Sequence, residues 1–146
     1  MTQSPELTGG AGFTYEGAVA AFYLVGLLCE ESAPALNDRI VMRVALQQSA
    51  FGEPLDDVIV DAQASNGEIA RLSLQVKRSL TISDAASNDD FREIVNNSWR
   101  TLQKTDFREG IDRYGAATDT ISEAAKRDLN TVCEWARASQ TPATFF

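Results

Sequence analysis

The feature that most constrains the fold is a pair of strand-like segments on either side of a turn signal. "DVIVDA" occupies residues 57–62, and "ARLSLQVK" occupies residues 70–77 with apolar and polar side chains in alternation. Short segments of this kind favour β-strands over helices. Ser65, Asn66 and Gly67 lie between them, and Asn-Gly readily adopts the positive φ angles of a tight hairpin turn. The sequence therefore predicts an antiparallel β-hairpin.

Polar side chains gather at the open end of this hairpin. If Asn66-Gly67 is the turn, Asp57 lies opposite Gln75, and Lys77 follows one pleat further along the same face. Desolvating such groups is costly unless they have partners. A hard cation could take an oxygen of Asp57, the amide oxygen of Gln75 and the backbone carbonyl of Val76. The hairpin thus predicts a binding site at this end.

The remaining segments predict an α/β domain with the element order α-β-β-β-α-β-α. Residues 15–29 are apolar on nearly every face, which favours a helix packed on more than one side. Residues 39–48 read as a strand and complete a three-stranded meander with the hairpin. Residues 87–104 and 120–139 have apolar side chains at helical spacing, and a short strand is expected at 112–119 between them.

The expected domain boundaries follow from composition. Residues 1–12 read as a flexible tail, residues 13–140 as the domain, and residues 141–146 as a tail or the start of a linker to a missing C-terminal sensor or assembly domain. The apolar run at 18–28 is too short to span a bilayer and has no basic flank before it. We therefore expect a cytoplasmic protein without a membrane partner.

Composition excludes several kinds of chemistry. The chain has no histidine, which removes Ser-His-Asp and Cys-His catalysis and most zinc hydrolase sites. Cys29 and Cys133 lie far apart in the sequence, so neither a disulfide framework nor a thiolate metal site is indicated. The net charge of -8 argues against binding nucleic acid by bulk electrostatics but allows a local basic site. The positive residues of the middle of the chain are Arg71, Lys77, Arg78, Arg92, Arg100, Lys104 and Arg108.

An Asp at the start of one strand and "QVK" on the next, within an α-β-β-β-α-β order, resemble the PD-(D/E)XK restriction-endonuclease-like superfamily. The Gln variant resembles Mrr-like nucleases and the N-terminal effector nuclease domains of bacterial antiphage defence proteins. "FTYEGAVAAFYL", residues 13–24, is similar to the first helix of such domains. The resemblance runs from about Gly12 to the last helix. It implies a restriction-endonuclease-like αβββαβ core, with a mixed central sheet flanked by helices.

The resemblance also implies roles for individual residues. Asp57 corresponds to the principal metal-binding carboxylate, Gln75 to the residue that replaces the family's Glu or Asp, and Lys77 to the catalytic lysine. Glu16 corresponds to the helix-borne carboxylate that holds the metal or its water, and the Val76 carbonyl completes the ligand set. The implied activity is hydrolysis of phosphodiester bonds in double-stranded DNA with Mg²⁺, for which Mn²⁺ can substitute, by a homo-oligomer.

Several alternatives remain open from the residues. Asp56 competes with Asp57 for the position of the main ligand. The polar end of the hairpin also fits a solvated sheet edge. Asp89 and Asp90 read more simply as acids of a helix's first turn. Trp99 and Trp135 read as core or interface residues. The alternative function is a catalytically degenerate nuclease-fold domain that binds nucleic acid or drives self-association.

Overall fold

The computed structural model describes residues 5–83 and 85–139, with side chains from Tyr15 onward. The elements are α1 (Pro5–Leu28), β1 (Ile40–Leu46), the short 3₁₀ helix η1 (Gln48–Phe51), β2 (Val58–Gln63), β3 (Ile69–Ser79), α2 (Asp89–Leu102), β4 (Arg113–Thr120) and α3 (Glu123–Ala138). Apart from η1, this is the element order that the sequence predicts.

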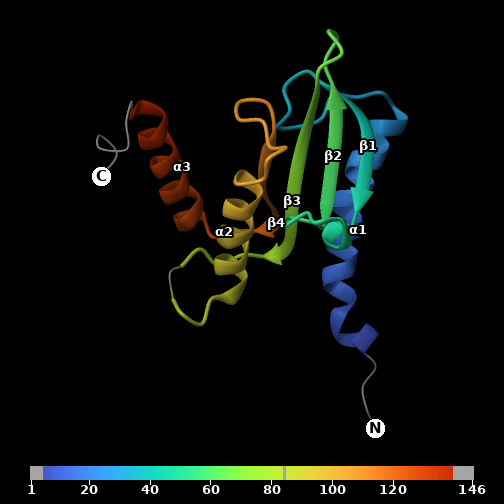
Figure 1. Cartoon of the computed structure of the whole chain (residues 1–146). Coiled ribbons are helices and arrows are strands. Elements are labelled where there is room, and N and C mark those ends of the chain that lie inside the picture. The colour runs from blue at the N-terminus through green and yellow to red at the C-terminus, as the bar shows by residue number, and fades with distance from the viewer. Residues whose placement is uncertain (1–4, 84, 140–146) are drawn as a thin grey trace.

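The four strands form one mixed sheet with the order β1-β2-β3-β4, as Figure 1 shows. The first three strands are antiparallel neighbours, and β4 is parallel to β3 because α2 carries the chain back across the sheet. Val58 lies opposite Leu74, and Ala62 lies opposite Ala70. The predicted hairpin and its register are therefore confirmed, and the fold is α/β with a mixed sheet.

The core lies between α1 and one face of the sheet, where α1 contacts β1, β2 and β3; Figure 1 shows α1 behind β1 and β2. Leu72, Leu74 and Val76 are buried on this face, as the alternation in their strand predicts. Tyr23 of α1 packs into the same cluster. Helix α2 lies in front of the sheet beside β4, and α3 stands beside α2, away from the sheet (Figure 1).

The first helix differs from the prediction at its start. It begins at Pro5, so residues 5–12 are helical, although the sequence predicts them to belong to a flexible tail. Proline is favoured at the first position of a helix, and that start signal outweighs the glycines that follow. The predicted tail or linker at 141–146 and the first four residues lie outside the described residues.

The expectation that this helix packs on more than one side is wrong. Phe22 and Leu28 are 58% and 83% exposed, because α1 packs on a single sheet face and no other described element covers its outer side. Trp99 and Trp135, predicted to be core or interface residues, are 63% and 61% exposed, so they are not core residues, and the interface alternative stays a prediction. Among the described residues, no helix combines the length and the apolar character needed to cross a membrane.

Candidate active site

Asp57 and Gln75 meet at the end of the sheet where β2 begins and β3 ends. The side-chain amide Nε2 of Gln75 donates a hydrogen bond of 2.6 Å to Oδ2 of Asp57. The backbone N–H of Val76 donates to the same oxygen at 2.7 Å. The hairpin register places these residues opposite one another, so the predicted proximity is confirmed. Their catalytic and metal-binding roles remain predictions.

The carboxylate of Asp57 lies in an environment that disfavours its negative charge. Burial raises its pKa above the ordinary value of 3.8, although the hydrogen bond from the N–H of Val76 acts in the opposite direction. The charges of Glu16 and Asp56 raise this pKa further, and the charge of Lys77 lowers it. A cation bound near Asp57 would therefore offset the negative charges of Glu16 and Asp56.

The side chain of Gln75 contains a buried oxygen that lacks a hydrogen-bond partner among the described residues. The residue is only 7% exposed, and its Oε1 atom is buried with no hydrogen-bond partner in the described part of the chain. A buried acceptor without a partner costs about 1–3 kcal/mol. An amide oxygen is also one of the atom types that hard cations accept as ligands, so the metal-binding role of Gln75 stays a prediction.

Glu16 reaches the site from α1. Its carboxylate accepts a hydrogen bond from Nε2 of Gln47, which follows β1. The backbone N–H of Gln47 in turn donates to the backbone oxygen of Asp57 at 3.3 Å. Sequence reasoning missed Gln47, because its contact depends on how α1 packs against β1. A single-sequence pattern contains no signal for it.

Lys77 shares a face of β3 with Gln75, and its ammonium pairs with two acids of α2. Its Nζ lies 3.1 Å from Oδ1 of Asp90 and 3.4 Å from Oε2 of Glu93. Burial lowers the pKa of Lys77, but the hydrogen bond and charge of Asp90 and the charge of Glu93 outweigh it, so this pKa lies above 10.5. Lys77 is therefore a cation at neutral pH. Asp89 and Asp90 are first-turn acids of α2, as predicted, and Asp90 also pairs with this lysine.

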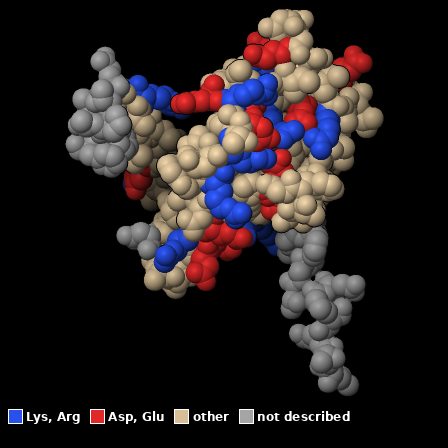
Figure 2. All heavy atoms as spheres, viewed as in Figure 1, with Lys and Arg blue, Asp and Glu red and all other residues tan. Residues whose placement is uncertain are grey.

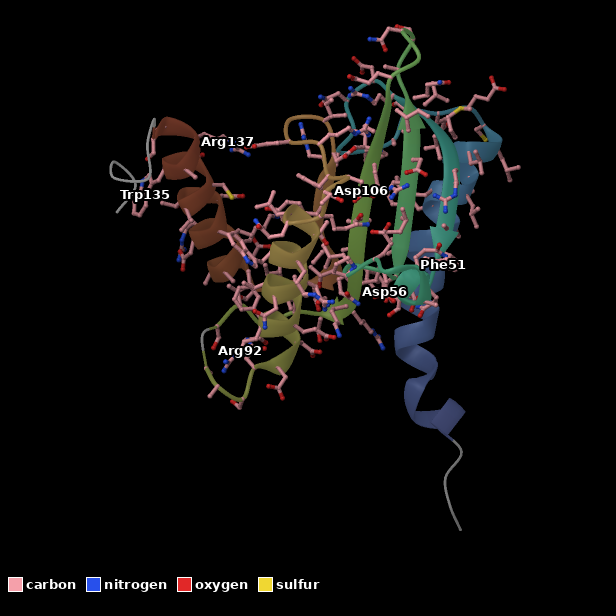
Figure 3. All side chains as sticks on the ribbon, viewed as in Figure 1. Phe51, Asp56, Arg92, Asp106, Trp135 and Arg137 are labelled. Carbon is pink, nitrogen blue, oxygen red and sulfur yellow. The ribbon has the colours of Figure 1, made fainter. Side chains whose placement is uncertain are left out.

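Asp56 occupies the same end of the sheet but makes different contacts. Figure 3 labels it where β2 begins, and its backbone oxygen accepts a hydrogen bond of 2.9 Å from the N–H of Gln48. The carboxylate that contacts Gln75 belongs to Asp57. Of the two candidates, the geometry favours Asp57 as the main ligand.

The donor set fits a small divalent cation such as Mg²⁺. The predicted set contains the carboxylates of Asp57 and Glu16, the buried amide oxygen of Gln75 and the carbonyl of Val76. All are hard oxygen donors, which Mg²⁺ and Mn²⁺ prefer. No group of three His, Cys, Asp or Glu side chains within the described ranges could hold a metal ion. A site here therefore depends on the amide and backbone oxygens.

The basic residues of the middle of the chain do not form one positive patch. Figure 2 shows Lys and Arg intermixed with Asp and Glu across the visible face. Arg71 pairs with Asp61 and Glu53, and Lys104 pairs with Glu53 as well. These pairs line a cavity of about 330 Å³, and neither Asp57 nor Gln75 is among its lining residues. Any DNA contact by these residues must compete with their own carboxylates.

Comparisons of the chain with protein-family models, curated proteins and solved structures found no match.

Proposed function

We propose that this chain is a Mg²⁺-dependent DNA endonuclease domain that hydrolyses phosphodiester bonds, with Mn²⁺ able to replace Mg²⁺. The observation that carries the proposal is the amide of Gln75: its nitrogen contacts Asp57, and its buried oxygen has no partner in the described residues. Folding alone does not require the unpartnered oxygen, because a buried acceptor without a partner lowers stability. The PD-(D/E)XK resemblance of the same residues gives the reaction class.

The chain's residues divide the chemistry between them. The carboxylates of Asp57 and Glu16 and the amide oxygen of Gln75 hold the divalent ion close to the end of the sheet. When bound, the ion neutralises charge on the scissile phosphate and acidifies the attacking water. The raised pKa of Asp57 makes this carboxylate protonate more readily than an ordinary aspartate, so ion binding weakens as the pH falls toward that pKa.

In this proposal Lys77 acts through its positive charge and does not act as a general base. Its raised pKa keeps the ammonium protonated at neutral pH. A protonated lysine cannot abstract a proton from water, but it can stabilise the negative charge that develops on the phosphate oxygens. The ion pairs with Asp90 and Glu93 hold the ammonium near the face where Gln75 lies.

The proposed substrate is double-stranded DNA, and the proposed active form of the protein is a homo-oligomer. One site cuts one strand, so two sites related by a two-fold axis are the simplest way to break a duplex. The antiphage nucleases that the sequence resembles act as effectors joined to sensor or assembly domains, and we extend that role to this chain.

A domain that self-associates or binds nucleic acid without cutting is the second candidate. A specific observation favours it: Leu129, Val132 and Trp135 of α3 form an apolar stripe that is exposed. Trp135 projects from the side of α3 that faces away from the sheet (Figure 3). Exposed apolar stripes of this kind mark contact surfaces.

Cleavage of supercoiled plasmid tests the proposal and separates the two candidates. The protein should nick and linearise plasmid with Mg²⁺ or Mn²⁺, and excess EDTA should stop the reaction. Lys77→Ala should remove cleavage and leave the circular dichroism spectrum unchanged, because Lys77 is partly exposed. Plasmid binding without metal-dependent cleavage would favour the second candidate, and cleavage that EDTA leaves unchanged would refute the metal mechanism.

A further inference from the structure

Gln47 joins the two carboxylate-bearing segments of the candidate site. It lies between β1 and η1, with its side-chain amide donating to the carboxylate of Glu16 on α1. Its backbone N–H donates to the backbone oxygen of Asp57 at 3.3 Å. One residue thus contacts both the helix and the strand from which the carboxylates come.

The backbone of Gln47 is in a conformation that its residue type disfavours. Its φ and ψ angles are 52° and 53°, in the left-handed region. A side chain with a Cβ atom is strained there, whereas glycine is free of that strain and asparagine tolerates the region better than most residues. Glycine or asparagine would therefore suit this turn better than glutamine.

Folding alone does not account for glutamine at this position. Gln47 is exposed, and an exposed hydrogen bond contributes little net stability because water competes for both partners. The property that glutamine has and asparagine lacks is the reach needed to contact Glu16. Residues that keep an unfavourable backbone conformation beside a candidate site often serve function.

We propose that Gln47 is a positioning residue that holds the Glu16 carboxylate toward Asp57, so that the two can bind one divalent cation. This inference rests on the proposed metal site. The amide of Gln47 fixes the orientation of a long, flexible side chain before the cation arrives. Loss of a group that orients a metal ligand typically weakens metal binding about 10- to 100-fold.

Gln47→Asn isolates the side-chain contact from the backbone. Asparagine keeps an amide and accepts the left-handed conformation, but it is one methylene too short to reach Glu16. We expect the dissociation constant for Mn²⁺, measured by electron paramagnetic resonance of free Mn²⁺, to rise about 10- to 100-fold. The metal-free melting temperature should stay the same or increase. Only the part of Mn²⁺ binding that Asp57→Asn abolishes is assigned to this site. Weaker binding elsewhere on the surface is thereby left out of the comparison.

Gln48→Asn is the matched control. The amide of Gln48 donates to the backbone oxygen of Leu46 at 2.6 Å, whereas the amide that contacts Glu16 is that of Gln47. The same shortening at this neighbouring position should leave the Mn²⁺ dissociation constant unchanged. An equal loss of affinity in both variants would overturn the inference, because it would trace the effect to the turn as a whole.

Glu16→Ala tests whether Gln47 acts through Glu16. In the Glu16→Ala background, Gln47→Asn should have no further effect on Mn²⁺ binding. A further loss would show that Gln47 acts on the metal by itself, against the inference. If the unaltered protein binds Mn²⁺ at Asp57 and Gln47→Asn binds it equally well, the inference alone fails. If the unaltered protein binds no Mn²⁺ at Asp57, the proposed metal site fails together with it.

Discussion

The side-chain amide of Gln75 donates a 2.6 Å hydrogen bond to Asp57 across the end of the β2–β3 hairpin, while the other amide atom, Oε1, is buried without a partner in the described residues. Asp57 therefore has a neutral amide as its side-chain partner. If this site binds a cation as we propose, a neutral amide in place of a carboxylate should make that binding weaker.

Gln75→Glu should convert this hydrogen bond into a repulsion that Mg²⁺ relieves. In EDTA, the added carboxylate beside Asp57 should lower the free energy of unfolding by about 1–3 kcal/mol. Adding Mg²⁺ should restore it, because an ion that binds only the folded state stabilises that state. Gln63→Glu, at the other end of β2, is the control and should show no specific Mg²⁺ response. A Gln75→Glu variant that is indifferent to Mg²⁺ in thermal unfolding would contradict a cation site here.

The raised pKa of Asp57 should appear in the pH dependence of stability. Between the ordinary pKa of 3.8 and the raised value, the folded state binds more protons at Asp57 than the unfolded state. The contribution of Asp57 to the free energy of unfolding therefore falls as pH rises through this window. Asp57→Asn removes the effect, so it should be as stable as the unaltered protein or more stable at pH 7 without metal.

Urea unfolding in EDTA at several pH values measures this difference. The stability advantage of Asp57→Asn should shrink as the pH is lowered to 3.8. The opposite trend, in which the stability of Asp57→Asn relative to the unaltered protein is lower at pH 7 than at pH 4, would contradict this prediction. Asp57 would then have a structural role that its burial does not suggest.

The ionised carboxylate of Asp112 should stabilise the folded state, whereas that of Asp57 should destabilise it. Its buried carboxylate accepts hydrogen bonds from the backbone N–H groups of Arg71 and Arg108 and from the Arg108 guanidinium. Burial raises its pKa, but the bonds from Arg108 and Arg71 outweigh burial and hold this pKa below 3.8. The stability that these bonds add is present above pH 3.8 and is lost as the pH falls through the lowered pKa.

Asp112→Ala should lower the free energy of unfolding at pH 7 by about 3 kcal/mol, because it leaves buried donors without a partner. Asp128→Ala is the control. Asp128 pairs with Arg127 on an exposed face of α3, where both side chains are more than 70% exposed. That substitution should change stability by less than about 0.5 kcal/mol. Equal effects of the two substitutions in urea unfolding would contradict the structural role of Asp112.

The sequence predicts the Asp57–Gln75 contact because Asn66-Gly67 fixes the hairpin register, and register decides which side chains face each other. It does not predict the partners of Lys77, since Asp90 and Glu93 come from a helix whose docking on the sheet depends on tertiary packing. It does not predict the contact of Gln47 with Glu16 either, because that contact also depends on how a helix packs on the sheet. Ser73 and Gln75 alternate with apolar residues and so suggest a solvated face, yet both are buried.

The exposed stripe of α3 should carry self-association. Trp135→Ser combined with Val132→Ser should convert a dimer to a monomer in sedimentation velocity, because the interface would lose apolar area. Trp99→Ser, which changes an equally exposed tryptophan on α2, should leave the dimer intact. A protein that sediments as a monomer at all concentrations and still linearises plasmid without nicked intermediates would refute the dimer.

The most direct test of the account compares Asp57→Asn with Asp56→Asn in Mg²⁺-dependent plasmid cleavage. The two substitutions remove the same charge from adjacent residues, but only the carboxylate of Asp57 contacts Gln75 in the structure. We predict that Asp57→Asn lowers the cleavage rate about 100-fold or more, while Asp56→Asn cleaves at close to the unaltered rate. Equal rates for Asp57→Asn and the unaltered protein would contradict the site.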